Sequence, residues 1–162
     1  MIIKRIKLEN YTVFEDHQIE FDPGINIFIG ENGTGKTHLF KVLYSACQCV
    51  DQRVSFSHKL VSTMLPDDYK ISRLITRKQG NRSALIRIFA GERDVTQERV
   101  LSASFHGKTK KWDAEVTGEK GWDEPESNIN PSYISIIVEL LLELQRKGVQ
   151  VFVSTHDYMI AS

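Results

Sequence analysis

Long hydrophobic runs are absent from this sequence of 162 residues. None of its apolar stretches approaches the roughly 18 residues that a membrane-spanning helix needs. The N-terminal stretch MIIKRIKLEN is too short and too charged to be a signal peptide. We therefore predict a cytoplasmic protein without a membrane partner.

An excess of charge of either sign is also absent, because 21 Lys and Arg residues balance 21 Asp and Glu residues. No global positive field therefore indicates a nucleic-acid partner. A local group of basic residues is interpreted as the solvated face of a hairpin. Its members are Lys70, Arg73, Arg77, Lys78, Arg82 and Arg87.

Cysteine is scarce, with only two residues in the whole chain. Cys47 and Cys49 lie two positions apart in a predicted helix, so their side chains point in different directions. That spacing suits neither a zinc site nor a redox pair, and we predict free thiols near a core. The hydrophobic content of 41% is ordinary for a globular protein, and the length allows one domain.

The N-terminal quarter has the pattern of strands followed by a helix. Ile2 to Leu8 alternates apolar and charged residues, which predicts a strand, and two further strands are predicted over Ile19–Phe21 and Ile25–Ile29. A glycine-rich turn follows, and apolar residues at helical spacing then predict a helix over Lys36–Cys49. Residues 51 to 70 have no clear pattern.

An antiparallel meander is predicted next, with a helix and a strand after it. The four meander strands are Ile71–Thr76, Ala84–Phe89, Arg99–Phe105 and Lys111–Val116, with turns at residues 79–81, 90–91 and 106–107. Asn130 and Pro131 are typical of a helix start, and Gly148 is typical of a helix end. Val149–Ser154 is a predicted apolar strand near the C-terminus.

A phosphate-binding turn matches the pattern G-x-x-x-x-G-K-[ST] in full, between an apolar strand and an amphipathic helix. Its main-chain N–H groups and the positive end of the helix dipole would bind phosphate oxygens. Lys36 would reach the β- and γ-phosphates, and the Thr37 hydroxyl would ligate Mg²⁺. The predicted nucleotide-binding residues are Gly30, Glu31, Asn32, Gly33, Thr34, Gly35, Lys36, Thr37 and His38.

Three further residues gain a role once this turn is present. Asp123 would hold Mg²⁺, and Glu124 would polarise the attacking water as a general base. His156 follows the predicted strand Val149–Ser154, at the end where open α/β sheets bind ligands, and could contact the γ-phosphate. The predicted catalytic residues are thus Lys36, Glu124 and His156, and the predicted metal ligands are Thr37 and Asp123.

The succession GENGTGKT, DEPESNINP and STHD resembles the ATP-binding-cassette ATPases, within the branch of the SMC, RecF and OLD-like heads. The resemblance covers residues 1–50 and 122–160. It implies an α/β P-loop NTPase fold with a mixed central sheet plus an antiparallel β-meander. By the resemblance, Asp123 and Glu124 form Walker B, residues 127–130 form the D-loop, and His156 is the switch histidine.

Two features of these ATPases are missing from the sequence, namely the helical subdomain with its signature motif and the apolar strand that enters Walker B. A polar segment precedes Asp123 instead, and such a segment cannot hold a carboxylate against a metal ion. Either a segment is omitted between Gly121 and Trp122, or the protein is a remnant that binds nucleotide without hydrolysing it. We expect one discontinuous head made of residues 1–50, 51–121 and 122–162.

The function implied by the resemblance is that of a head that binds and hydrolyses MgATP between two copies of the chain, in DNA repair or phage defence. A DNA partner is compatible with this, although the net charge gives it no support. The alternatives are the nucleotide-binding subunit of a membrane transporter and a non-hydrolysing adaptor that uses nucleotide only to fold.

Overall fold

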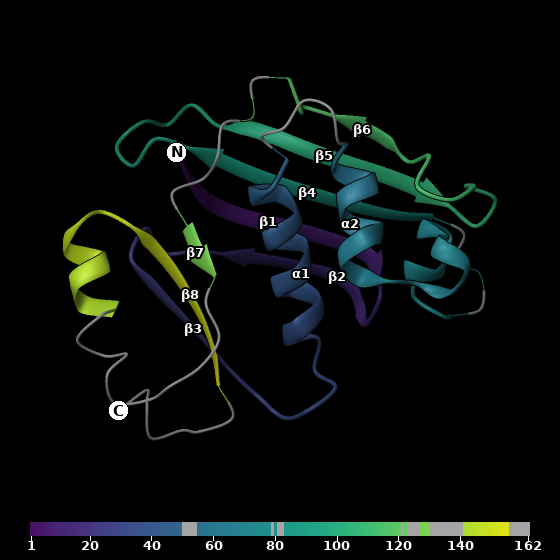
Figure 1. Ribbon diagram of the computed structural model, residues 1–162, viewed down its shortest axis with the longest axis horizontal. Helices are drawn as coiled ribbons and strands as arrows, with labels where there is room; N and C mark the ends of the chain where they lie inside the picture. Colours follow the sequence, from purple (N-terminus) through teal and green to yellow (C-terminus); the bar gives the residue numbers. More distant parts are fainter. Residues whose placement is uncertain are drawn as a thin grey trace.

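The computed structural model contains two β-sheets, which Figure 1 shows beside each other. The larger sheet is antiparallel and has the strand order β2-β1-β4-β5-β6. Its strands are β1 (Ile2–Tyr11), β2 (Phe14–Glu20), β4 (Ser83–Gly91), β5 (Arg99–His106) and β6 (Glu115–Thr117). The structure describes residues 1–49, 55–78, 80, 83–120, 122, 127–129 and 141–155.

Alternating side chains explain why β1 occupies an inner position of this sheet. Ile6 and Leu8 are fully buried on one face, whereas Lys7 and Glu9 lie on the other face and form an ion pair of 3.1 Å. Such alternation is what a sheet covered on one side requires. The sequence predicts a lobe boundary at residue 50. Strands β1 and β4 come from the two sides of that boundary and pair directly, so this sheet contains strands of both expected lobes.

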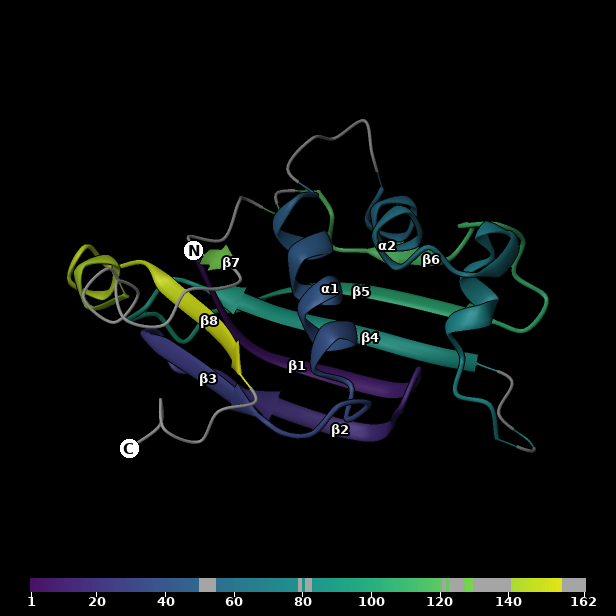
Figure 2. The same cartoon turned by 60° about the horizontal axis from the view of Figure 1, so that its bottom comes forward.

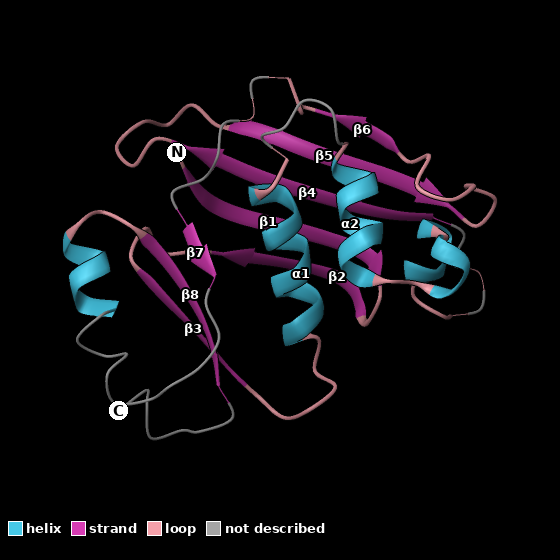
Figure 3. Ribbon diagram, in the orientation of Figure 1, coloured by secondary structure: helices cyan, strands magenta, loops and turns pink. Residues whose placement is uncertain are grey.

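Two helices cover one face of the antiparallel sheet, as Figures 2 and 3 show. They are α1 (Lys36–Cys47) and α2 (Phe56–Met64), and α2 lies in the segment where the sequence showed no pattern. Ser55 caps α2 by accepting a hydrogen bond from the His58 N–H at 3.3 Å. The core lies between these helices and the sheet and includes Leu43, Leu60 and Ile88.

The smaller sheet is parallel and has the strand order β3-β8-β7. It consists of β3 (Ile25–Ile29), β8 (Gln150–Thr155) and β7 (Ser127–Ile129). Residues 141–146 are helical, and Gly148 ends this helix with a φ of +81°. The α/β class with an antiparallel sheet is confirmed, but the parallel and antiparallel strands form two separate sheets among the described residues.

One buried amide connects the two sheets. Gln150 of β8 is fully buried, and its Oε1 accepts a hydrogen bond from the Ile3 N–H at 2.9 Å. Its Nε2 donates to the carbonyls of Ile3 at 2.7 Å and Asp22 at 2.8 Å. Ile3 is fully buried, so Gln150 supplies partners to its N–H and carbonyl and fixes the parallel sheet against β1.

Several predicted elements differ from the structure. The predicted strand Ile71–Thr76 is wrong, because the chain forms 3₁₀ turns η1 (Asp67–Tyr69) and η2 (Ile71–Leu74) there, and only Ile75 makes an isolated bridge, to Tyr11. Ile71 and Leu74 are both buried, and a 3₁₀ turn brings residues three positions apart to the same side. The β-branched composition of the segment suggested a strand instead. The predicted turn at residues 90–91 lies inside β4.

No helix among the described residues is long and apolar enough to cross a membrane.

Candidate nucleotide-binding site

The glycine-rich turn lies between β3 and α1, as its pattern predicted. β3 ends at Ile29, and α1 begins at Lys36. Gly35 directly precedes the helix with a φ of +96°, and a Cβ atom there would lie 2.5 Å from Val13 Cγ2. Gly33 has a φ of +84° and open space around it. Positive φ at both positions is what lets the loop turn its amides inward.

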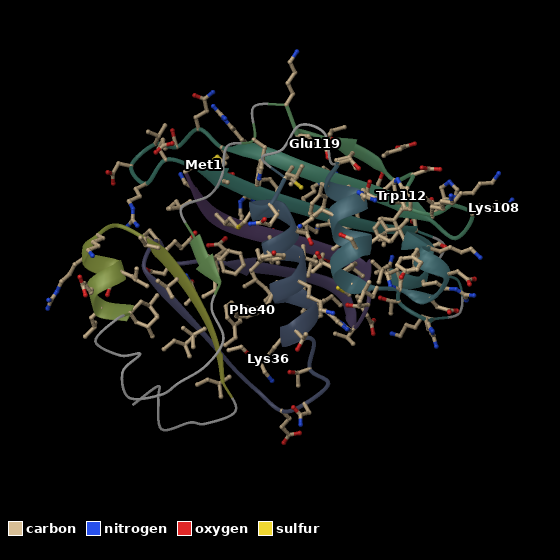
Figure 4. The ribbon with its side chains drawn as sticks, viewed as in Figure 1. Met1, Lys36, Phe40, Lys108, Trp112 and Glu119 are labelled. Atoms are coloured by element: carbon tan, nitrogen blue, oxygen red, sulfur yellow. The ribbon has the colours of Figure 1, made fainter. Side chains whose placement is uncertain are left out.

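Lys36 lies over the loop at the start of α1, where Figure 4 labels it. Its ammonium donates hydrogen bonds to the carbonyls of Gly30 and Glu31, the latter at 2.7 Å. The Thr34 hydroxyl lies 3.4 Å from the same ammonium and donates to the Glu31 carbonyl at 2.9 Å. The positive charge is therefore held at the mouth of the loop by neutral acceptors, which phosphate oxygens can replace.

A pocket of about 290 Å³ opens at this turn. The residues that line it are Asn32, Gly33, Thr34, Gly35, Lys36, Thr37, His38 and Ser154. Seven of them belong to the predicted nucleotide-binding set, and they combine a row of main-chain amides, a helix N-terminus and a lysine. That combination fits an anionic phosphate chain. The predicted residues Gly30 and Glu31 do not line the pocket but hold Lys36 through their carbonyls.

Ser154 is a pocket residue that sequence reasoning missed. It lies in β8, which pairs in parallel with β3, so that Phe28 is opposite Ser154 and Ile29 is opposite Thr155. The carboxyl ends of both strands therefore meet at the glycine-rich turn. The apolar run 149–154 and its polar end were a usable signal, because parallel strands carry ligand-binding residues at their carboxyl ends.

A second, smaller cavity of about 160 Å³ lies at the end of β5, far along the chain from the glycine-rich turn. Ser104, His106, Asp113 and Glu115 are among its lining residues. None of the predicted site residues lines it, and the described residues contain no group of three or more His, Cys, Asp or Glu side chains suited to a metal ion.

His38 has an unusual electrostatic environment within the site. Its Nδ1 is enclosed and has no hydrogen-bond partner among the described residues. Burial, and secondarily the charge of Lys41, lower the pKa of the His38 ring. The ring is therefore neutral near pH 7 while no anion is bound.

The predicted residues His156, Asp123 and Glu124 lie outside the described residues. The residue before His156 is Thr155, which pairs with Ile29, the residue before the glycine-rich turn. The residue before Asp123 is Trp122, whose Nε1 donates to the Ala46 carbonyl at 3.0 Å. Gly121 also lies outside the described residues, so the expected omission between Gly121 and Trp122 stays a prediction.

The described neighbours of the acidic pair lie at the far ends of α1 and β8 from the glycine-rich turn. Ala46 is ten residues along α1 from Lys36, which is about 15 Å at the rise of an α-helix. Ser127 pairs with Gln150, five residues or about 16 Å along β8 from Thr155. Figure 4 shows the same separation, with Lys36 at one end of the molecule and Glu119, a hydrogen-bond partner of Trp122, at the other.

The predicted D-loop also differs from the structure. Ser127–Ile129 form strand β7, whose backbone pairs with β8, and Asn130 lies outside the described residues. A short polar sequence gave no sign of this pairing, because the partner strand supplies the hydrogen bonds that hold it.

Comparison with known proteins decides the family. The family model described as AAA domain matches residues 5–154, which is most of the chain. The chain belongs to this AAA domain family. The relatives described next are RecF and SMC head proteins, from the branch that the sequence resembles.

Curated relatives of this AAA domain chain include two bacterial proteins named DNA replication and repair protein RecF. The RecF of Streptococcus agalactiae is 34% identical over 88 residues, which are 54% of this chain and 24% of RecF. The RecF of Phocaeicola vulgatus is 47% identical over 49 residues, which are 30% of this chain and 13% of that RecF. The chain thus spans about a quarter or less of the length of these relatives.

Solved structures agree in fold. A structure of the recombination mediator protein RecF with ATP is 19% identical with a TM-score of 0.50, and covers 80% of this chain and 32% of that one. An SMC head of Pyrococcus furiosus is 16% identical with a TM-score of 0.55, and the match covers 86% of this chain and 37% of the SMC chain. At these identities the likeness concerns the fold.

Proposed function

We propose that this AAA domain chain binds MgATP at the glycine-rich turn and hydrolyses it to ADP and phosphate. The observation that carries the proposal is the pocket at the carboxyl end of β3, which residues 32–38 of the glycine-rich turn and the start of α1 line together with Ser154. Lys36 would exchange its loop carbonyls for β- and γ-phosphate oxygens. Thr37 would contribute a hydroxyl ligand to Mg²⁺, which ordinarily retains several waters and phosphate oxygens as its other ligands.

Hydrolysis would need residues beyond the described pocket. In the proposal, Asp123 holds Mg²⁺, Glu124 activates water and His156 contacts the γ-phosphate. The pairing of Thr155 with Ile29 supports the role of His156, because it brings the preceding residue to the turn. The positions of Trp122 and Ser127, which lie toward the far ends of α1 and β8 from the turn, do not support the role of the acidic pair.

A second candidate function is nucleotide binding without hydrolysis. The placement of Trp122 and Ser127 favours it, since both lie about 15 Å from the site along α1 and β8. This candidate and the ATPase agree on the pocket and differ only in turnover.

Phosphate release and nucleotide affinity, measured on the same preparations, separate the two functions. Lys36→Ala abolishes binding in both cases, and with it the turnover of an ATPase, because it removes the charge at the pocket. Glu124→Gln lowers turnover more than a hundredfold and preserves affinity if Glu124 activates water. Wild-type binding without phosphate release, unchanged by Glu124→Gln, would establish the non-hydrolysing function. If Thr37→Ala and Asp123→Asn weaken nucleotide binding only when Mg²⁺ is present, the result would support Thr37 and Asp123 as ligands of Mg²⁺.

Assembly into an ATP-dependent homodimer is part of the proposal, as is a cytoplasmic role in DNA repair. One solved relative comes from work on ATP-driven dimerization and DNA stimulated activation of SMC ATPases, and it is 15% identical with a TM-score of 0.55, covering 88% of this chain and 98% of that one. Light scattering with a non-hydrolysable ATP analogue tests dimerisation. Phosphate release measured with and without DNA tests whether DNA is a partner. A rate of phosphate release that DNA does not change contradicts that role.

A further inference from the structure

Strand β8 contributes one residue to the pocket, Ser154. The other lining residues lie between Asn32 and His38, in the glycine-rich turn and the first turn of α1. In sites of this pattern the main-chain amides of the turn enclose the α- and β-phosphates. Ser154 approaches the ligand from a different strand, so it can contact a part of the phosphate chain that the turn does not enclose.

The pairing of β8 with β3 fixes the direction of the Ser154 side chain. Successive side chains of a strand point to opposite faces of the sheet, and residues opposite each other on paired strands point to the same face. Phe28 is opposite Ser154, and the Phe28 ring packs against Phe40 of α1 with 5.5 Å between the ring centroids. Ser154 therefore lies on the face of the parallel sheet that is turned toward α1, at the strand end where the pocket opens.

Polarity along this face of β8 changes at Ser154. Gln150 and Phe152 lie on the same face, because they are four and two positions before Ser154, and both are fully buried. Ser154 is exposed, and its hydroxyl makes no hydrogen bond to any residue that the structure describes. The hydroxyl is therefore available to a ligand in the pocket.

Lys36 identifies the part of the ligand that lies beside β8. Its ammonium is bonded to the carbonyls of Gly30 and Glu31, directly after the end of β3. Neighbouring strands are about 4.8 Å apart, and the carboxyl ends of β3 and β8 lie at the same end of the molecule as the start of α1 (Figure 1). A lysine in this motif binds the β- and γ-phosphates. The outer end of the phosphate chain is therefore adjacent to β8.

We propose that the Ser154 hydroxyl donates a hydrogen bond to a γ-phosphate oxygen of bound ATP, so that Ser154 determines the preference of the pocket for ATP over ADP. The inference rests on the proposed nucleotide site and adds a specificity residue to it. ADP has no γ-phosphate, and in its complex the hydroxyl stays bonded to water. Because a hydrogen bond to a charged oxygen is stronger than one between neutral groups, we expect the contact to favour the triphosphate about tenfold.

A small side chain at position 154 also leaves room for the phosphate chain, and two variants separate size from hydrogen bonding. Ser154→Ala keeps the small size and removes the hydroxyl. Ser154→Thr keeps the hydroxyl and adds a methyl group, in a strand, where β-branched residues are favoured. Ser104→Ala is the matched control, because it removes a hydroxyl from strand β5, outside the nucleotide pocket.

The test is calorimetric titration of the whole chain with Mg²⁺ and either ADP or a non-hydrolysable ATP analogue whose γ-phosphate is intact. The measured quantity is the ratio of the two affinities in each protein. Ser154→Ala should weaken binding of the analogue about tenfold and change ADP binding by no more than about twofold. Ser154→Thr and Ser104→Ala should keep the wild-type ratio. Circular dichroism checks that each variant is folded.

An unchanged ratio in Ser154→Ala would overturn the contact with the γ-phosphate. Equal weakening of both nucleotides would place the hydroxyl on another part of the ligand, and no weakening would leave only the small size of the side chain as its role. Loss of the ratio in Ser154→Thr would also overturn the contact, because this variant retains the hydroxyl. Absence of binding of both nucleotides by the wild type would instead overturn the proposed function itself.

Discussion

The two sheets of this AAA domain chain differ in burial, and the difference separates stability from binding. The antiparallel sheet and the helices α1 and α2 contain most of the buried core. In the parallel sheet, Phe152 of β8 is fully buried, but every residue of β3 is partly or well exposed, and Ile27 is 40% exposed. The nucleotide pocket opens at the end of this less buried sheet.

The pocket lies where the two regions meet, because α1 contributes Lys36, Thr37 and His38 and β8 contributes Ser154. The antiparallel sheet supplies the apolar burial that stabilises the domain. The parallel sheet supplies converging strand ends and is hydrogen-bonded to β1 through the buried amide of Gln150. Substitutions in the two regions should therefore have different consequences, and the following predictions test this, from the largest effect on stability to the smallest.

The largest loss of stability is expected in the antiparallel sheet. Ile88 of β4 is fully buried, and Ile88→Ala should lower the free energy of unfolding by about 3 kcal/mol because it leaves a cavity. Ile27→Ala in β3 is the control and should cost about 1 kcal/mol or less, since Ile27 already contacts water. Urea unfolding measures both. Equal losses would mean that the two sheets do not differ in this way.

The connection between the sheets comes next. Gln150→Leu removes three hydrogen bonds and takes from the buried N–H and carbonyl of Ile3 the partners that Gln150 supplies, so we expect a loss of about 2–3 kcal/mol. Gln18→Leu, on an exposed position of β2, should change stability by about 0.5 kcal/mol or less. The measurement is again urea unfolding. A Gln150→Leu protein as stable as Gln18→Leu would show that packing alone holds the sheets together.

The glycines of the turn should differ from each other. Gly35→Ala combines a positive φ with a Cβ atom 2.5 Å from Val13 and should cost about 2 kcal/mol or more. Gly33→Ala has the same backbone strain in open space and should cost about 1 kcal/mol. Thermal unfolding and ADP affinity of the two variants provide the test. If Gly33→Ala lowers stability more than Gly35→Ala, the close approach of Gly35 to Val13 is not the reason that position 35 requires glycine.

The smallest effect on stability concerns Cys49, which is buried just after the end of α1. Burial raises the pKa of the Cys49 thiol to about 12, so its thiolate is rare at pH 8. In a Cys47→Ala background, a thiol reagent at about pH 8 should modify native Cys49 about a thousandfold more slowly than the unfolded chain. The raised pKa also means that this group's contribution to stability is present below about pH 8.5 and is lost as the pH rises toward 12. Rapid native labelling would contradict the burial of Cys49.

The sequence by itself determined the elements whose signals are local. The alternation in Ile2–Leu8, the complete glycine-rich motif and the helix after it were all predictable, and the structure has β1, the turn and α1 at these places. Glycine at positions 33 and 35 permits the positive φ found there, because only glycine adopts it without strain. The predicted pocket residues from Asn32 to His38 therefore lie together as expected.

Only the tertiary structure decided features that depend on partners distant in sequence. Helix α2 was missed because its apolar face is short and is recognised only against α1 and the sheet. The segment Ile71–Leu74 forms a 3₁₀ turn, in which both Ile71 and Leu74 are buried. Ser154 joined the pocket through the register of β8 with β3. Residue patterns record local geometry, whereas pairing and burial are set by which surfaces meet once the chain has folded.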